Sequence, residues 1–312
     1  MEFLNLSNVR AAVVSVDSLH DLGLDLETLA GSGEIDLDSN KDIPQYQYRY
    51  DKILRGKKYD FDYAKTLEGA QSVLICAVSI PVHHVGFTLE EEEVDVRIPA
   101  DYMQREVVKK LEEALRKMFK EYGYSVQKAK LPLKLLAVRS GLAEYGRNNL
   151  AYVVGFGSQH VLVAFYVDCP LPADMWREPV RMTLCNTCRN CLNHCPTQAI
   201  VENRRTIKAE RCIVLYNEFQ DEMPKWIPNG AHNALIGCLR CEEKCPVNLK
   251  YKHQDRKLGV FDEKQTAEIL QTRNLKDLSK STYEKIVAYE IDEYYPVFHR
   301  NFALLIKDRT NR

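Results

Sequence analysis

The sequence lacks the features of several large protein classes. No apolar run approaches the roughly 20 residues that span a bilayer, and the longest candidates, such as SVLICAVSIPV at 72–82, have the length of a strand. The 43 basic and 44 acidic residues leave a net charge of −1, so no overall field attracts nucleic acid or anionic lipid. The first residues do not resemble a signal peptide. We therefore expect a cytoplasmic protein with neither a membrane nor DNA as a partner.

Internal repeats are also absent, except that two cysteine-rich runs resemble each other. They read CNTCRNCLNHCP at 185–196 and CLRCEEKCP at 238–246. The first has the C-x2-C-x2-C-x3-C-P spacing of bacterial ferredoxins, in which three cysteines bind one iron–sulfur cubane and the fourth binds the other. The pattern makes electron transfer the first hypothesis.

Two 4Fe-4S clusters need eight thiolates, and the two runs supply seven. Cys212, in the segment ERCIVLY between the runs, is the expected eighth ligand. We assign one cluster to Cys185, Cys188, Cys191 and Cys245, and the other to Cys195, Cys212, Cys238 and Cys241.

Zinc and disulfide bonds are the alternatives for these cysteines. C-x2-C pairs also bind zinc, but a zinc site does not need the third cysteine or the x3-C-P ending that both runs carry. Disulfides fit poorly in a reducing cytosol. The two remaining cysteines, Cys76 and Cys169, lie in apolar surroundings, where a free cysteine behaves as a small hydrophobic residue.

The pattern outside the cysteine runs predicts an α/β protein. The apolar run at 72–81 indicates a central strand buried on both faces, residues 101–122 have the periodicity of an amphipathic helix, and 160–167 indicates another strand. Glutamates dominate LEEEE at 89–93, which reads as a solvated loop or lid edge, and the basic stretch 250–257 also reads as a solvated loop. We expect an α/β core at 1–180, the cluster module at 181–249, and a C-terminal segment at 250–312. That last segment is predicted to hold two helices broken at Pro296 that pack on the core.

One further stretch is more specific than the cysteines alone. SGLAEYGRNNL at 140–150 is followed by Gly157, Ser158 and Asp168, and the cysteine runs end in CPTQAI and CPVN. Together these motifs resemble the cobalamin-dependent epoxyqueuosine reductases, which are relatives of the reductive dehalogenases. The resemblance extends from QSVLICAVSIP at residue 71 through the cysteine module, and weakly to FHRNFALLI near the end.

The resemblance implies a nitroreductase-like core that binds cobalamin beside the cluster module. Electrons from an external donor such as a ferredoxin or flavodoxin would pass through both clusters to cobalt, and the cofactors would carry the chemistry. Glycines would let backbone approach the corrin. The positions that match the family's corrin-binding loop and the following turn are Gly141, Leu142, Gly146, Asn148, Asn149, Gly157 and Ser158. The motif D-x-H-x-x-G of other cobalamin proteins is not complete at 81–86, where Pro81 replaces the aspartate.

Two departures from the family concern the proton donor. The family aspartate falls in the register of Gln127-Lys128-Ala129-Lys130, where no carboxylate is present, and Met103 replaces the histidine that follows the family's Asp-Tyr pair. Lys128 would donate a proton only if burial lowered its pKa. The catalytic candidates are therefore Lys128, Tyr102, Asp101 and Tyr145.

The leading hypothesis is a cobalamin- and 4Fe-4S-dependent oxidoreductase that resembles epoxyqueuosine reductase. Its substrate is open, with a transfer RNA among the candidates. One rival is an electron carrier that reduces the corrinoid of a partner. Another is a ferredoxin module fused to a flavin-binding core, which no specific motif supports.

Overall fold

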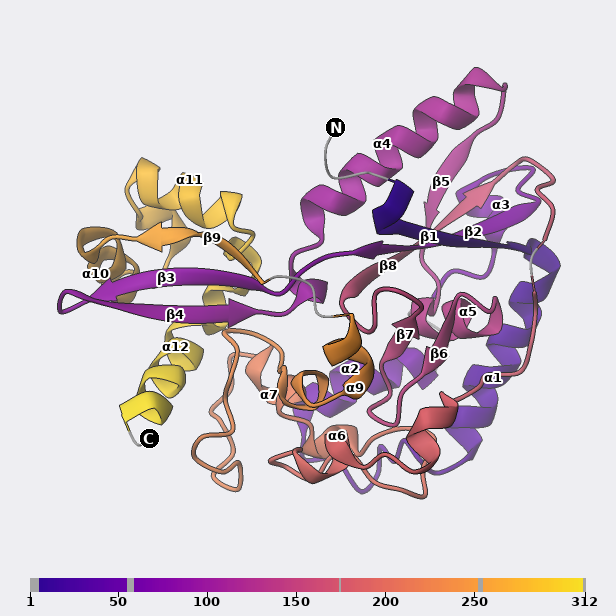
Figure 1. The fold of residues 1–312 in the computed structure, drawn as a ribbon. Coiled ribbons are helices and arrows are strands. Elements are labelled where there is room, and N and C mark those ends of the chain that lie inside the picture. Colours follow the sequence, from indigo (N-terminus) through magenta and orange to yellow (C-terminus); the bar gives the residue numbers. More distant parts are fainter. Residues whose placement is uncertain (1–5, 55–58, 174, 252–254, 311–312) are drawn as a thin grey trace.

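The main sheet has four antiparallel strands in the order β1-β2-β8-β5. This computed structural model describes residues 6–54, 59–173, 175–251 and 255–310 (Figure 1). The strands are β1 (Val9–Ser15), β2 (Ser72–Ser79), β8 (His160–Val167) and β5 (Val126–Ala129). β2 and β8 are the interior strands, so both of their faces need cover.

Alternate residues of β2 pack into two different cores. Val73 and Ile75 face α1 (Leu19–Gly31) and α5 (Leu133–Arg139). Leu74 and Cys76 face α4 (Arg105–Glu121) on the other side. Successive side chains of a strand point to opposite faces, so a strand covered by helices on both faces must be apolar throughout. The prediction of a central strand buried on both faces is confirmed, and Cys76 is a core residue.

A second, three-stranded sheet has the order β4-β3-β9. β3 (His83–Leu89) and β4 (Glu92–Ile98) form a hairpin, and β9 (Arg256–Phe261) pairs with β3 in parallel. The glutamate run is therefore not a loop or lid edge: it forms the hairpin turn and the start of β4, and Glu90 and Glu91 adopt positive φ values of 50° and 68°.

The C-terminal helices pack on this second sheet. They are α10 (Glu263–Gln271), α11 (Lys280–Ala288) and α12 (Tyr295–Thr310). The ring centroid of Phe87 in β3 lies 5.1 Å from that of Phe261 and 4.9 Å from that of Phe302. Within the described ranges, this cluster contains no residue of the four main strands. The segment thus packs on the hairpin, and Pro296 lies in the first turn of α12 instead of at the break between the helices.

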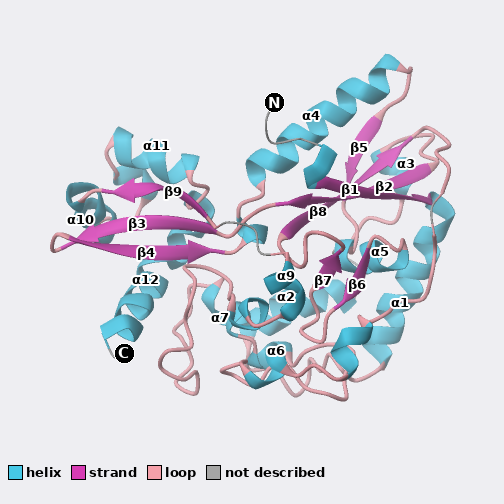
Figure 2. Ribbon diagram, viewed as in Figure 1, coloured by secondary structure: helices cyan, strands magenta, loops and turns pink. Residues whose placement is uncertain are grey.

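The cysteine-rich segment lies below the two sheets in the view of Figure 2. Its helices are single turns: α6 (Asn190–Asn193), α7 (Ile213–Asn217), α8 (Arg240–Glu243) and α9 (Pro246–Lys250). The remaining elements are α2 (Pro44–Leu54), α3 (Tyr63–Thr66), β6 (Ala143–Tyr145) and β7 (Ala151–Val153). The part of the basic stretch at 252–254 lies outside the described residues. None of the helices in the described ranges has both the length and the apolar character to cross a membrane.

Candidate iron–sulfur and active site

A small cavity beside α6 brings four cysteines together. Its wall contains Cys185, Cys188, Cys191 and Cys245. Three come from the first cysteine run, and the fourth comes from the end of the second run, 54 residues further along the chain than Cys191. These are the four residues that the sequence assigns to one cluster.

A larger cavity on the other side of the loop 146–150 contains the other four. Its wall includes Cys195, Cys212, Cys238 and Cys241. About 1180 Å³ of this space holds no protein atoms, and part of it is open to solvent. The cavity is therefore larger than a cysteine site alone needs, and it continues past the cysteines to α2 and the segment before α4.

Burial keeps three thiols of the second set, those of Cys212, Cys238 and Cys241, neutral when no metal is bound. The pKa is raised to about 11 for Cys212 and to about 12 for Cys238, chiefly by burial and in part by the neighbouring thiols. Burial likewise raises the pKa of Cys191 in the first set to about 11. Only thiolates ligate iron, so loading these sites must release protons. A donor set of four thiols in each cavity fits a 4Fe-4S cluster.

The loop between β6 and β7 lies between the two cavities. Asn148 lines both of them, and its Nδ2 donates to the Tyr152 hydroxyl at 3.0 Å. The Asn148 side chain also reaches the thiol of Cys241, and the Tyr152 hydroxyl reaches that of Cys245. Hydrogen bonds to cluster sulfurs tune reduction potentials. Sequence reasoning did not identify Tyr152, since an isolated tyrosine carries no motif.

The glycines expected to approach a corrin have another role in the described structure. A side chain on Gly146 would collide with the ring of Tyr152, and one on Gly157 would collide with Asn248 Oδ1. Gly141 faces Met175 at 3.3 Å. These glycines make room for neighbouring side chains of the protein. Of the predicted corrin-binding positions, only Asn148 and Asn149 line the larger cavity, and Leu142 packs on the main core.

Ser158 joins the turn after β7 to the second cysteine run. Its backbone N–H donates to Asn248 Oδ1 at 2.9 Å, and its hydroxyl donates to Glu242 Oε2 at 2.7 Å. Asn248 Nδ2 in turn donates to the Ser158 hydroxyl at 2.9 Å. Burial, followed by repulsion from Asp101, raises the pKa of Glu242 to about 8. Ser158 therefore holds α8 and α9 in place, and its role in the described structure is a structural contact with the cluster segment.

Two of the four catalytic candidates face the larger cavity. Asp101 and Tyr102 line it together with Glu218 and Arg49. The Tyr102 hydroxyl donates to Glu218, which also pairs with Arg49. Asp101 lies deep in the protein but is exposed to the solvent of the cavity. Burial, with the charge of Glu218, raises its pKa to about 6. Asp101 can therefore hold a proton closer to neutral pH than an ordinary aspartate.

The other two candidates lie elsewhere. Lys128 is exposed on β5 and lines neither cavity. It therefore lacks the burial that a role as proton donor would require. Tyr145, on β6, packs against the main core. Its backbone N–H donates to the carbonyl of Val180 at 2.9 Å. Neither side chain is positioned to act in the larger cavity.

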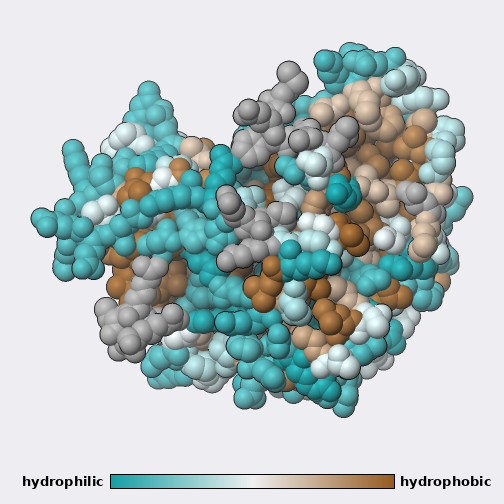
Figure 3. Space-filling model, in the orientation of Figure 1, coloured by the Kyte–Doolittle hydropathy of each residue, from teal (hydrophilic) through white to brown (hydrophobic). Residues whose placement is uncertain are grey.

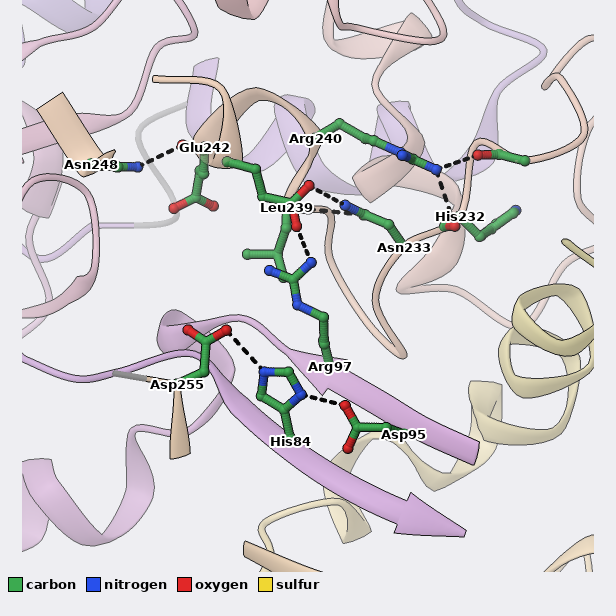
Figure 4. Close-up of polar contacts among 12 residues, drawn as sticks. His84, Asp95, Arg97, His232, Asn233, Leu239, Arg240, Glu242, Asn248 and Asp255 are labelled. Carbon is green, nitrogen blue, oxygen red and sulfur yellow. Dashed lines mark hydrogen bonds and ion pairs between the residues drawn. The ribbon is translucent and has the colours of Figure 1, made fainter. Parts of the chain in front are cut away.

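Figure 4 shows how the β3–β4 hairpin is tied to the cluster segment. Arg97 of β4 pairs with Glu243 of α8. His84, which directly follows the histidine position of the incomplete cobalamin motif, has Nδ1 2.5 Å from Asp95 and Nε2 3.0 Å from Asp255. Both ring nitrogens are thus engaged by carboxylates of the hairpin and of the segment before β9, away from the cysteine cavities.

Comparisons with known proteins agree with this arrangement. Residues 184–248 match a family described as a 4Fe-4S double cluster binding domain. Epoxyqueuosine reductase from Xanthomonas campestris is 32% identical over 149 residues, which are 47% of this chain and 41% of the relative. The enzyme from Cyclobacterium marinum is 30% identical over 198 residues, 60% of this chain and 61% of the relative. These matches span about two to three fifths of the relatives' own length.

Solved structures extend the likeness over nearly the whole chain. The epoxyqueuosine reductase of Streptococcus thermophilus has a TM-score of 0.60 at 16% identity and covers 98% of this chain and 80% of that one. An epoxyqueuosine reductase with an epoxyqueuosine-modified tRNA-Tyr stem loop has a TM-score of 0.61 at 18% identity and covers 98% and 79%. At these identities the likeness establishes the fold.

The fold and the cysteine cavities define an α/β protein with two main sheets and a double 4Fe-4S cluster binding domain. The family match decides the choice between iron–sulfur clusters and zinc in favour of clusters. Within this class, the chain is similar in sequence to the epoxyqueuosine reductases over about half of its length and has their fold.

Proposed function

We propose that this protein is an oxidoreductase of the epoxyqueuosine reductase type, with two 4Fe-4S clusters and a cobalamin. The observation that carries the proposal is the larger cavity, in which four cysteines and the pair Asp101–Tyr102 share one wall. The two cysteine sets, divided as the sequence assigns them, would hold the clusters. The curated relatives support the reaction class.

The rest of the larger cavity is the proposed cobalamin site. The residues that line it include Lys134, Asn148, Asn149, Tyr50 and Arg49. These side chains offer amides, charges and one aromatic ring to a large polar cofactor. Bound there, cobalamin would supply a low-valent cobalt next to the second cluster. The residues of this chain would bind and orient the cofactor and the substrate.

We assign the proton donor of this reaction to Asp101. Its carboxyl group faces the cavity and its pKa is raised to about 6, which favours proton transfer near neutral pH. Tyr102 is a positioning residue, because its hydroxyl proton is already donated to Glu218. Asp101 would take the part that the missing family carboxylate plays, since the register 127–130 lies at an exposed edge of the sheet.

The substrate proposed first is epoxyqueuosine in a tRNA stem loop, as in the tRNA-bound relative. The test is anaerobic reconstitution with iron, sulfide and cobalamin, followed by metal analysis and incubation with an epoxyqueuosine-containing stem loop. About eight irons and one cobalt per chain, with conversion to queuosine, would support the proposal. Eight irons without cobalt would favour the electron carrier, and bound flavin would favour the third hypothesis.

A further inference from the structure

Two exposed segments cover the first cysteine cavity. They are residues 181–196 and 244–251, and they are neighbours because Asn190 Nδ2 donates to the carbonyl oxygen of Lys244 at 3.1 Å. Asn190 and Pro246, one from each segment, line the cavity itself. We call the exposed surface of these two segments the α6–α9 face.

Exposed residues lie next to the first cavity. Leu184, Asn186 and Thr187, which flank Cys185 and Cys188, are exposed. A cluster in the first cavity would therefore lie under a surface that an external redox partner can approach.

The α6–α9 face is basic, although the whole chain has a net charge of −1. Its two segments contain four basic residues, Arg181, Arg189, Lys244 and Lys250, and neither aspartate nor glutamate. Arg189 pairs with Glu202, which lies outside the two segments. Lys244 and Lys250 are exposed and form no ion pair with any described residue. A negatively charged partner would find complementary charge here.

Apolar side chains are exposed on the same face. Leu184 is 47% exposed and Leu249 is 58% exposed. Val154, 79% exposed, belongs to the β7 turn, which the Ser158–Asn248 hydrogen bond fixes to α9. Figure 3 shows apolar surface around α9 within a hydrophilic surround. Apolar contacts inside a charged rim are typical of a protein–protein interface.

We propose that the α6–α9 face is the docking site of a small acidic electron-carrier protein of the ferredoxin or flavodoxin class. The inference rests on the proposed function, because it requires a cluster in the first cavity. In each encounter the carrier would give one electron to a cluster held by Cys185, Cys188, Cys191 and Cys245, with no bond made or broken. Such redox encounters bury little area and depend on charge for their rate.

The test uses the reconstituted protein and reduced flavodoxin in a stopped-flow spectrometer. The charge-reversal variant Lys244→Glu/Lys250→Glu should lower the second-order rate of cluster reduction by about tenfold or more at low salt. High salt should reduce the difference between the reduction rates of the variant and the wild type, because salt screens the charges. Reduction by dithionite, which needs no docking, should be unchanged. The matched control is Lys109→Glu/Lys117→Glu, which makes the same charge change on exposed positions of α4, and its rate should equal that of wild type.

Three outcomes would separate the possible failures. Missing iron, or no reduction of wild type by dithionite, would overturn the proposed function itself. Normal dithionite reduction with equal flavodoxin rates in wild type and variant would overturn the docking site alone. Loss of RNA stem-loop binding with intact flavodoxin rates would assign the face to nucleic acid and also overturn it. Because Lys244 adjoins Cys245, Leu249→Asp/Lys250→Glu serves as a second variant, and iron content is measured for both.

Discussion

At the scale of single residues, Cys212 is the strictest test of the cluster assignment. It lies outside both cysteine runs, yet it lines the larger cavity with three cysteines from them. Cys212→Ser should lower the iron content from about eight to about four per chain and leave the spectrum of the other cluster. Cys169→Ser, at a half-buried cysteine outside both cavities, is the control and should keep all the iron. Full iron in the Cys212 variant would refute the assignment.

Asp101 predicts a pH dependence of the proposed reaction. Its pKa is raised to about 6, chiefly by burial, so it holds its proton below about pH 6 and loses it above. Turnover should therefore fall as the pH rises through this region. Asp101→Asn should lower kcat by about 10²–10⁴-fold and abolish this limb of the profile. Steady-state rates measured between pH 5 and 8 would show this fall. The same pH dependence in the variant would mean that another group donates the proton.

Tyr152 predicts a change in reduction potential without loss of a cluster. Its hydroxyl reaches Cys245 of the first set, and a donor to a cluster sulfur stabilises the reduced, more negative state. Tyr152→Phe removes that donor, and a hydrogen bond worth about 1 kcal/mol corresponds to about 40 mV for one electron. The potential of one cluster should become more negative by about this amount in a redox titration. Tyr166→Phe, in the main core, should leave both potentials unchanged.

The sequence could predict the cysteine partition because ligand spacing is a local and countable property. It could not predict that Lys128 is exposed, because the accessibility of a strand residue depends on which strand lies at the edge of the sheet. The sequence also did not predict the roles of Glu218 and Arg49. Glu218 accepts a hydrogen bond from Tyr102, and Arg49 pairs with Glu218. Each of the two lies more than 50 residues from Tyr102 along the chain, and no motif connects them.

At the scale of elements, the turn of the β3–β4 hairpin is strained. Glu90 and Glu91 both have positive φ, which costs an ordinary L-residue about 1–2 kcal/mol. Asn-Gly suits this type of two-residue turn. Glu90→Asn/Glu91→Gly should therefore raise the free energy of unfolding by about 1–2 kcal/mol, measured by denaturant titration. Glu90→Gln/Glu91→Gln removes the same charges without the turn preference. An equal gain in that variant would show that charge, not backbone conformation, is responsible.

The main sheet was predictable and the second sheet was not, for a physical reason. β2 is a continuous apolar run and α4 has a strong helical periodicity, and both patterns reflect the cores on which these elements pack. β3 pairs with β9, about 170 residues later in the sequence, and its edge partner β4 begins with glutamates that suggest a loop. A short strand defined by a distant partner has little local signal. The C-terminal helices were expected, but without β9 the surface on which they pack could not be identified.

At the scale of the whole molecule, the clusters would be part of the fold. The cysteine segment has only single-turn helices, so its stability must come from contacts and from metal. Asn301 of α12 donates to the carbonyls of Asn217 and Leu235, both at 2.8 Å. The hairpin adds the Arg97–Glu243 pair. These contacts attach the segment to the C-terminal helices and the hairpin, while Ser158 attaches it to the turn after β7.

Removal of iron should therefore affect the two sheets unequally. In the apo protein the buried thiols are neutral and no longer hold the runs 185–195 and 238–245 together, so these residues should lose protection from hydrogen exchange. α12, tied to them by Asn301, should lose part of its protection. β2 and β8 should keep theirs, since their cores contain none of the eight cysteines. Hydrogen-exchange mass spectrometry before and after chelation would measure this. Loss of protection across β2 and β8 would instead mean that the clusters and the main sheet fold as one cooperative unit.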